Sequence, residues 1–402
     1  MKVLLLTNEF PPQTYGGAGV HVDYLSREMR KLAAVDVRAF GKQHVREDGF
    51  EVTGFSVDTS GYRAPKNLHG VFAAAQRAID FSAAGVDANV VHAHTWYAHM
   101  GGIVAKLCYG IPLVITVHSL EPLRPWKREQ LGGGYDFSSW VERTAIEMAD
   151  AVIAVSDGTR NDILRLFDVH PKKVHIIYNG IDTREFRKVD TSPALSRFGI
   201  DPAKPYVLFV GRITRQKGIT YLAEAIRFMD GGYQVVLAAG APDTPEIAAE
   251  MKALVAAASK DRGGIIWLDE ILDRPTLIQL YSGAEVFCCP SIYEPFGIIN
   301  LEAMACETAV VGACVGGIPE VVVHDQTGFL VPVAQELEAP YLPVCPEDYA
   351  RDLADQINRL MADPELRARF AAAGRARAEE RFGWPRIAQQ THDLYQSLIR
   401  SK

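Results

Sequence analysis

The chain has 402 residues, of which 48% are hydrophobic and 23% charged, and its formal net charge is -7. This length exceeds what a single hydrophobic core usually serves, so we expect two domains. The acidic balance argues against a nucleic-acid-binding protein, since such proteins usually present a basic field. The apolar run Val3–Leu6 is too short for a signal peptide, and no apolar stretch reaches the roughly 20 residues that span a bilayer. The six cysteines form no C-x-x-C pair, as is typical of reduced core thiols. We expect a cytoplasmic protein without membrane attachment.

Short apolar runs alternate with amphipathic stretches through the first half of the chain. This pattern predicts a parallel sheet that is buried on both faces and covered by helices. The expected strands are Val3–Thr7, Val90–Ala93, Leu113–Val117, Ala151–Val155 and Val174–Ile177, and the clearest helices are Val20–Leu32, Trp140–Ala149 and Gly158–Phe167.

A charged, proline-bearing segment, 182–205, interrupts this pattern, which then restarts at Tyr206–Val210. Further strands are expected at Gln234–Ala238, Ile265–Leu268, Val286–Cys289 and Ala309–Gly312, with helices at Tyr221–Met229, Glu246–Ala258, Leu277–Ser282 and Ile298–Ala305. We therefore predict an α/β fold of two facing, doubly wound, Rossmann-like domains, 1–195 and 196–378, followed by a terminal helix, 379–402. Ligands of open α/β sheets bind at the carboxyl ends of the strands, so an interdomain cleft is the expected site.

A glycine-rich loop, Tyr15-Gly16-Gly17-Ala18-Gly19, follows the first expected strand and precedes a helix. Glycine lets backbone N–H groups approach an anion closely, and the helix start favours negative charge. Gly16 and Gly17 are therefore candidate phosphate-binding residues, although a plain tight turn has the same composition. The spacing does not match a nicotinamide fingerprint, which disfavours a dehydrogenase.

Two cations, Arg212 and Lys217, follow the strand Tyr206–Val210 in the loop Gly211–Gly218. Arginine offers a planar fork to phosphate oxygens and lysine a compact point charge. Such a pair stabilises the negative charge that grows on a diphosphate leaving group. Their position after a strand favours this role over that of solvated surface cations.

A third motif, 290–302, runs from the end of a strand into a helix that begins near Ile298. The N–H groups of Phe296, Gly297 and Ile298 lie at this helix start and can donate to phosphate or sugar oxygens. Glu294 lies in the loop and can accept from sugar hydroxyls. Glu302 lies one turn inside the helix, among apolar neighbours, where a carboxylate needs partners.

Histidines and aromatic residues end two strands of the first half. His118 directly follows Leu113–Val117 and is a candidate for contacting a sugar, with a structural histidine as the alternative. His92 and His94 alternate along one strand and so share a face. We find no convincing third ligand beside them and expect no metal site. Trp96, beside Tyr97, is either part of a sugar-stacking platform or a core residue.

The ordered set of motifs resembles the retaining glycosyltransferases of family four, in particular the bacterial glycogen synthases. The resemblance covers nearly the whole chain and rests on the Gly16-Gly17 loop, the Arg212…Lys217 pair and the E-x7-E spacing of Glu294 and Glu302. The segment from His118-Ser119-Leu120-Glu121 to Gly132-Gly133-Gly134-Tyr135 resembles a branch that includes enzymes making maltose 1-phosphate from ADP-glucose and glucose 1-phosphate.

The resemblance implies the GT-B fold and a role for each candidate residue. Gly17 would bind phosphate, Arg212 and Lys217 the diphosphate, Glu294 the donor glucose, Glu302 the ribose, and His118 would face the transferred sugar. The family needs no metal, retains the anomeric configuration by front-side attack, and folds its last helix back onto the first domain. The larger glycogen synthases have a lysine where Thr14 stands here, which leaves one phosphate contact open.

We therefore expect a glucosyltransferase that forms α-1,4 bonds from ADP-glucose, without a further cofactor, as a glycogen synthase. The alternatives are a maltose-1-phosphate synthase with glucose 1-phosphate as acceptor, or transfer to a different acceptor. Lys127 and Arg128, in the loop after His118, are candidates for recognising an acceptor phosphate or are solvated cations. The sequence leaves the oligomeric state open, including a homo-oligomer.

Overall fold

The computed structural model describes residues 1–13 and 16–400, so Thr14 and Tyr15, the first residue of the glycine-rich loop, lie outside the described residues. It divides into two compact units: unit 1 comprises Met1–Gly180 and the segment from Trp384 onward, and unit 2 comprises Ile181–Gly383. This boundary precedes residue 195. The reason is that the proline-bearing segment packs on unit 2, where Val189 N donates to Ser282 Oγ at 3.2 Å and Ala194 N donates to Gln279 Oε1 at 2.9 Å.

Unit 1 is built on an eight-stranded sheet with the order β3-β4-β2-β1-β5-β6-β7-β8. All neighbouring strands run parallel except β3 and β4. The strands are β1 (Lys2–Leu6), β2 (Ala34–Phe40), β3 (His44–Glu47), β4 (Phe50–Phe55), β5 (Val90–His94), β6 (Leu113–Val117), β7 (Ala151–Ala154) and β8 (Val174–Ile176). The helices are α1 (Gly17–Met29), α2 (Lys66–Ala83), α3 (Trp96–Tyr109), α4 (Lys127–Leu131), α5 (Gly134–Met148), α6 (Asp157–Leu166) and α15 (Trp384–Arg400), with short 3-10 turns at Glu121–Leu123 and Pro171–Lys173.

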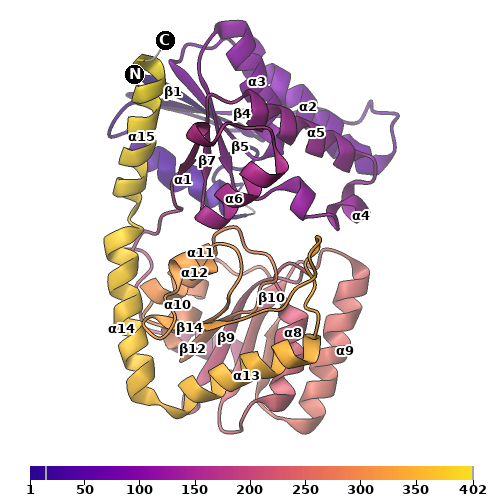
Figure 1. Cartoon of the computed structure of the whole chain (residues 1–402), viewed down its shortest axis with the longest axis vertical. Helices are drawn as coiled ribbons and strands as arrows, with labels where there is room; N and C mark the ends of the chain where they lie inside the picture. Colours follow the sequence, from indigo (N-terminus) through magenta and orange to yellow (C-terminus); the bar gives the residue numbers. More distant parts are fainter. Residues whose placement is uncertain (14–15, 401–402) are drawn as a thin grey trace. The chain divides into compact units, whose positions relative to one another are not determined.

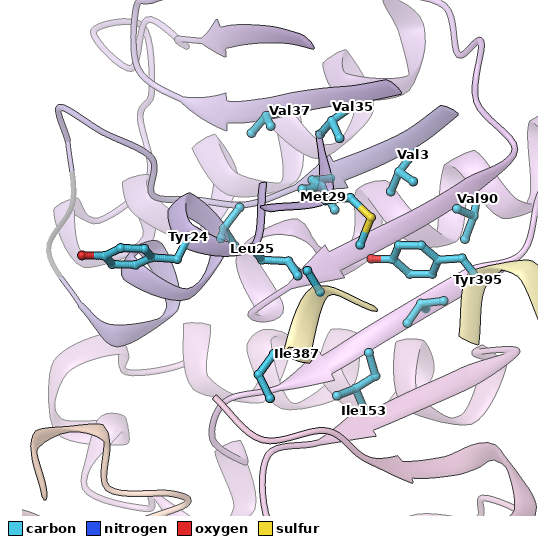
Figure 2. Close-up of a cluster of buried hydrophobic side chains, with 14 of the residues drawn as sticks. Val3, Tyr24, Leu25, Met29, Val35, Val37, Val90, Ile153, Ile387 and Tyr395 are labelled. Atoms are coloured by element: carbon cyan, nitrogen blue, oxygen red, sulfur yellow. The ribbon is translucent and has the colours of Figure 1, made fainter. Parts of the chain in front are cut away.

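Side chains of successive residues in β1 enter opposite layers of unit 1, as strand geometry requires. Val3 and Leu5 belong to a buried cluster that α1 and α15 complete (Figure 2). Leu6 points the other way, toward Gly101 of α3, whose close packing also involves Phe81 of α2. Figure 1 shows α1 and α15 on one side of this sheet and α2, α3 and α5 on the other.

The terminal helix α15 completes the core of unit 1. Its buried residues recur at the spacing of one helical face: Trp384, Ile387, Ala388, Thr391, Leu394 and Tyr395. The Trp384 ring stacks on Tyr24 of α1 with centroids 5.5 Å apart. A Cβ at Gly180 would lie 2.5 Å from the Trp384 ring, so only glycine leaves room for the indole there. This helix is therefore an integral part of unit 1 despite its distance along the chain.

Unit 2 contains a six-stranded parallel sheet with the order β11-β10-β9-β12-β13-β14 (Figure 1). The strands are β9 (Tyr206–Arg212), β10 (Gln234–Gly240), β11 (Ile265–Leu268), β12 (Val286–Cys289), β13 (Ala309–Ala313) and β14 (Gly328–Val331). The helices are α7 (Ser192–Phe198), α8 (Ile219–Ala225), α9 (Pro245–Asp261), α10 (Arg274–Gly283), α11 (Ile298–Ala305), α12 (Ile318–Val321), α13 (Pro346–Ala362) and α14 (Pro364–Arg381), with a 3-10 turn at Ile226–Phe228.

The expected α/β class is confirmed, while β2, β3, β4 and β14 were not anticipated. In β2 the apolar run is broken by Asp36 and Arg38, which form an ion pair of 2.9 Å inside the protein. The strands were predicted from continuous apolar runs, and the two charged residues interrupt such a run in β2. This explains why β2 was not predicted. Among the described residues, no helix is long and apolar enough to cross a membrane.

Candidate active site

Two loops at the carboxyl ends of β9 and β12 are held against each other in unit 2. Gly218 ends the first loop with a φ of +64°, and a Cβ on it would lie 1.9 Å from the Pro290 carbonyl oxygen. Ile292 N donates to Gln216 O at 3.0 Å. Glycine is therefore required at 218, and the close approach brings Lys217 beside the loop that contains Glu294.

Lys217 and Glu294, both predicted site residues, form an ion pair. The distance from Lys217 Nζ to Glu294 Oε2 is 2.7 Å, and the side chains are 21% and 9% exposed. Ser291 Oγ donates to the same carboxylate oxygen at 3.1 Å. Burial opposes the charged ammonium, but the Glu294 carboxylate and other neighbours outweigh it and raise the pKa of Lys217. Lys217 is thus a fixed cation at the mouth of the sheet.

Arg212, the last residue of β9, also faces a carboxylate. Its Nη1 donates to Asp243 Oδ1 at 2.9 Å, and Asp243 follows the neighbouring strand β10. Phosphate oxygens accept from a guanidinium in the same geometry as carboxylate oxygens. Because the guanidinium has five N–H donors, Arg212 can bind a phosphate while Asp243 holds its orientation.

The helix α11 begins at Ile298, as the motif predicted. Gly297 precedes it with a φ of +92°, and its carbonyl oxygen accepts from Asn300 Nδ2 at 3.1 Å. N–H groups in the first turn of a helix have no acceptor within that helix and favour an anion. Phe296 is only 2% exposed and packs edge-on against Phe382. Its side chain is therefore structural, and any ligand contact would come from the main chain.

Glu302 lies on α11 and is partly buried. The Tyr281 hydroxyl donates to Glu302 Oε2 at 2.9 Å. Burial raises the pKa of Glu302 to about 7, although the Tyr281 hydrogen bond works in the opposite direction. The carboxylate thus has the partner that its apolar surroundings require, and among the described residues no donor binds its other oxygen.

In unit 1, the two glycines at the start of α1, Gly16 and Gly17, differ in their surroundings. Gly16 N donates to Glu9 Oε2 at 2.6 Å, so a carboxylate already occupies this N–H group. A Cβ on Gly17 would meet no atom within 4 Å. The same helix-start electrostatics that predicted a phosphate here accounts for the Glu9 carboxylate. Space for a ligand is found at Gly17 rather than at Gly16.

His118, just after β6, is partly buried and lies beside the buried histidines His21 and His94. Its Nε2 lies 3.1 Å from His94 Nδ1. On α1, His21 Nδ1 lies 2.8 Å from Asn179 Oδ1. Burial lowers the pKa of His21 to about 4, and burial together with the neighbouring imidazoles holds the pKa values of His94 and His118 well below the usual range. These imidazoles are neutral at pH 7.

His92 shares the face of His94, as strand alternation predicted, with ring centroids 4.1 Å apart. Its Nδ1 lies 2.5 Å from the Tyr395 hydroxyl and its Nε2 lies 2.7 Å from Thr116 Oγ1. Both ring nitrogens are therefore engaged, and His92 connects β5 to α15 and β6.

The loop after His118 contains the two predicted acceptor-binding cations, and they differ in environment. Lys127 Nζ donates to Glu121 Oε1 at 2.8 Å, and the Lys127 side chain is only 12% exposed. Burial and the neighbouring Arg124 lower the pKa of Lys127. Arg128 is 54% exposed and pairs with Asp136. Lys127 thus supports the loop from inside, whereas Arg128 lies at the surface.

Arg124 is a third cation of this loop, which the sequence did not single out. Its Nη1 donates to Ser119 Oγ at 3.1 Å, directly beside His118, and its Nε is buried without a partner in the described chain. Trp96, in contrast, is 4% exposed and stacks on Tyr97 at a centroid distance of 4.0 Å. It packs in a small core cluster, which explains the apolar pattern without a sugar contact.

Residues 15–185 match the model of Glycosyltransferase Family 4, and residues 204–363 match that of Glycosyl transferases group 1. Over 403 residues the chain is 46% identical to the alpha-maltose-1-phosphate synthase of Mycolicibacterium smegmatis, which covers 99% of this chain and 100% of the relative. The chain belongs to the family-four glycosyltransferases.

Two further comparisons agree with this assignment. The alpha-maltose-1-phosphate synthase of Mycobacterium tuberculosis is 45% identical over 405 residues, covering 99% of this chain and 100% of the relative. Sucrose-phosphate synthase from Thermosynechococcus elongatus superposes with a TM-score of 0.81 at 24% identity, with 100% of both chains covered. That likeness confirms the GT-B fold of this family-four glycosyltransferase.

Several residues beside the predicted site of the glycosyltransferase were not anticipated: Glu9, His21, Asp243, Tyr281 and Ser291. Each is polar and contacts a predicted residue; the contacts of His21, Asp243 and Tyr281 join distant positions, whereas those of Glu9 and Ser291 are local. Ser291 alone carried a usable signal, because it lies within the predicted motif 290–302. Glu9 depends on the conformation of the loop after β1. The other three depend on which strands and helices become neighbours, which the sequence does not specify.

Proposed function

We propose that this glycosyltransferase moves glucose from ADP-glucose to the 4-hydroxyl of glucose 1-phosphate and so forms maltose 1-phosphate. The observation that carries the proposal is the 46% identity, over the full length of both chains, to a protein named alpha-maltose-1-phosphate synthase. Glycogen elongation, the first expectation from the sequence, receives no such support. Transfer to glucose 1-phosphate, the alternative in the sequence analysis, therefore becomes the main reading.

The donor side of the reaction is assigned to unit 2. Arg212 and Lys217 bind the diphosphate, with the first-turn N–H groups of α11 as further donors. Glu294, held by Lys217 and Ser291, accepts from hydroxyls of the donor glucose. Glu302, held by Tyr281, accepts from the ribose hydroxyls. Each carboxylate already has a fixed partner, so little side-chain ordering remains when the donor binds.

The bond changes require a cationic leaving-group site and no enzymic nucleophile. The bond between the anomeric carbon and the diphosphate oxygen breaks while the acceptor hydroxyl oxygen bonds to the same carbon from the same face. The hydroxyl proton passes to the departing diphosphate, which retains the α configuration. Lys217 and Arg212 stabilise the charge that develops on the diphosphate. His118, a neutral imidazole, can donate or accept a hydrogen bond with the transferred glucose.

The acceptor phosphate is assigned to the loop after His118 in unit 1. Arg124 is the best-placed cation, because its guanidinium lies against Ser119 and has an unpaired buried Nε–H among the described residues. Lys127 pairs closely with Glu121, at 2.8 Å, whereas Arg124 Nη1 lies 4.0 Å from the same carboxylate oxygen. Arg128 pairs with Asp136. We therefore rank Arg124 before the two cations named from the sequence.

A reducing, cytoplasmic setting suits this reaction and this chain. All six cysteines are free thiols in the structure. Three of them, Cys288, Cys289 and Cys306, are buried, and burial raises the pKa of each thiol. Such thiols are inert core residues.

The test is ADP release from ADP-glucose with three acceptors in parallel: glucose 1-phosphate, glycogen and water. The proposal predicts rapid release with glucose 1-phosphate and little with the other two. Release with glycogen alone would identify a chain-elongating synthase instead. If neither acceptor supports release, also with UDP-glucose as donor, the glucosyl-transfer reading is wrong.

A further inference from the structure

Three histidines of unit 1, two of them buried and His118 partly buried, converge from three different elements. His21 lies on α1, His94 ends β5, and His118 follows β6. One nitrogen from each lies within 4.8 Å of the other two. The strand register explains this arrangement, since β1, which leads into α1, pairs with β5, and β5 pairs with β6. The sequence had suggested His92 and His94 without a third ligand, whereas the structure groups His94 with His21 and His118.

The nitrogen atoms of these histidines are partly unused. Asn179 Oδ1 can only accept a hydrogen bond, so the contact of 2.8 Å places the hydrogen of His21 on Nδ1. The lone pair of His21 is then on Nε2, which is buried and has no partner among the described residues. His94 Nε2 is equally buried and unpartnered there. His21 and His94 are 3% and 0% exposed, and an unpaired polar atom at such depth is costly.

We propose that His21, His94 and His118 form a binding site for a transition-metal cation of the Zn²⁺ class, and that an ion bound there excludes the sugar from His118. Three imidazoles with an open fourth position are a known ligand set for Zn²⁺, with Zn–N distances of about 2.0–2.1 Å. Ligands on a tetrahedral ion of that size lie about 3.4 Å apart. When His94 binds the ion through Nδ1, its hydrogen lies on the unpartnered Nε2, and the separation of 3.1 Å between His94 Nδ1 and His118 Nε2 already approaches this value.

The surroundings favour such an ion in two further ways. Asn179 fixes the tautomer and orientation of His21, as a second-shell partner does in metal sites. Within residues 1–13 and 16–400, the ion pairs that involve a histidine are those of His324 and His392, so none of the three imidazoles pairs with a carboxylate. Neutral imidazoles select Zn²⁺, Co²⁺, Ni²⁺ or Cu²⁺ over Mg²⁺ and Ca²⁺, which prefer oxygen ligands.

The consequence for catalysis rests on the proposed function, in which His118 contacts the transferred glucose. An ion that takes the lone pair of His118 removes this contact and occupies the space beside it. The ion is therefore an inhibitor of transfer that competes with the donor sugar, and it is not a catalytic metal.

Metal binding is tested directly on the full chain, independently of activity. The protein is stripped with chelator and titrated calorimetrically with Zn²⁺, and separately with Co²⁺ while visible absorption is recorded. We expect one ion per chain and the intense absorption of tetrahedral Co²⁺, with no binding of Mg²⁺. Asn179→Ala should weaken the Zn²⁺ affinity by about 10- to 100-fold, because the second-shell partner is lost.

Matched variants locate the ion. His21→Gln should abolish stoichiometric binding, whereas His99→Gln should retain it, since His99 is equally buried but is not part of the group. Circular dichroism and thermal melting verify that both variants are folded, and the Co²⁺ spectrum of the wild-type protein decides the coordination geometry without any variant. Absence of stoichiometric binding in the wild type, or equal binding by folded His21→Gln, would overturn the site.

Competition between Zn²⁺ and ADP-glucose is measured last. Metal binding and inhibition of transfer can then be refuted independently of each other. Zn²⁺ should raise the apparent KM for ADP-glucose at unchanged kcat, and chelator should reverse the effect. Zn²⁺ binding without any effect on a measurable transfer rate would overturn the exclusion of the sugar. If the enzyme transfers no glucose at all, the proposed function fails while the titrations still decide the metal site.

Discussion

The Nζ atom of Lys217 lies 2.7 Å from Oε2 of Glu294, although the two residues are 77 positions apart in the sequence. The pair combines the cation assigned to the diphosphate with the carboxylate assigned to the donor glucose. Its geometry depends on the close approach of Gly218 to Pro290. In the proposed function, this one contact couples binding of the leaving group to orientation of the sugar.

Removing Lys217 should damage catalysis more than folding. Lys217→Met should lower kcat by about 10²- to 10³-fold, because one stabilising group of the leaving diphosphate is lost. It should also lower the free energy of unfolding by about 1–3 kcal/mol, since Glu294 is left without its partner in a partly exposed site. The double variant Lys217→Met/Glu294→Gln should recover stability but not kcat. Recovery of both would mean that the pair is only structural.

Replacing Arg212 tests its phosphate fork. Arg212→Lys keeps the charge but removes the planar set of donors, so kcat/KM for the donor should fall by about tenfold or more. Arg215→Lys is the matched control on the same loop, because Arg215 is 50% exposed and lies 3.8 Å from Glu250. Steady-state kinetics should show less than a twofold change for the control. Equal effects of the two substitutions would remove Arg212 from the site.

We expect donor affinity to depend on pH near neutrality because of Glu302. Burial raises the pKa of Glu302 to about 7, so the accepting carboxylate predominates only above that pH. Donor affinity should therefore rise between pH 6 and 8 (roughly one unit on either side of this pKa) in the wild type and stay flat in Glu302→Gln. A parallel pH dependence in both proteins would contradict the assignment.

The same pKa shift gives a stability effect of opposite sign. A carboxyl with a raised pKa favours the folded state most fully below its unfolded pKa, and this contribution is lost as the pH rises through about 7. Glu302→Gln removes the cost of the buried charge. We therefore expect the free energy of unfolding of Glu302→Gln, measured relative to that of the wild type by chemical denaturation, to be about 2 kcal/mol higher at pH 8 than at pH 5.

The acceptor loop is tested with two arginines of similar position and different exposure. Arg124→Met should raise the KM for glucose 1-phosphate by about tenfold while the KM for the donor stays constant, as expected for loss of a phosphate contact. Arg128→Met should leave both constants nearly unchanged, because Arg128 is 54% exposed and paired with Asp136. A larger effect of Arg128→Met would reverse this ranking and restore the prediction made from the sequence.

The packing of α15 on unit 1 can be tested by removing the Tyr395 hydroxyl, which contacts His92. Tyr395→Phe leaves buried His92 Nδ1 without its partner and should lower the free energy of unfolding by about 1–3 kcal/mol. Tyr109→Phe is the control, because this tyrosine is 41% exposed and the Ser82 carbonyl oxygen that accepts from its hydroxyl also accepts from Gly85 N. Its effect should stay within about 0.5 kcal/mol. Denaturant unfolding measures both values.

The sequence was sufficient for the local parts of this protein and insufficient for the distant pairings. The strand β9 and the helix start at Ile298 follow from apolar runs and glycine positions, so Arg212, Lys217 and Glu302 could be named. The partners Asp243 and Tyr281 could not, because they depend on which strands and helices become neighbours. Lys127 shows a second limit, because Glu121 is only six residues away and yet the loop conformation that pairs the two residues could not be predicted from their spacing.

The central claim is tested most directly by the structure of the product formed from ADP-glucose and glucose 1-phosphate. Mass spectrometry and proton NMR of the purified product should reveal a disaccharide monophosphate with an α-1,4 linkage and an intact anomeric phosphate. The coupling at the new anomeric centre should be that of the α configuration, which retention requires. A β linkage, or glucose released to water as the only product, would contradict the account.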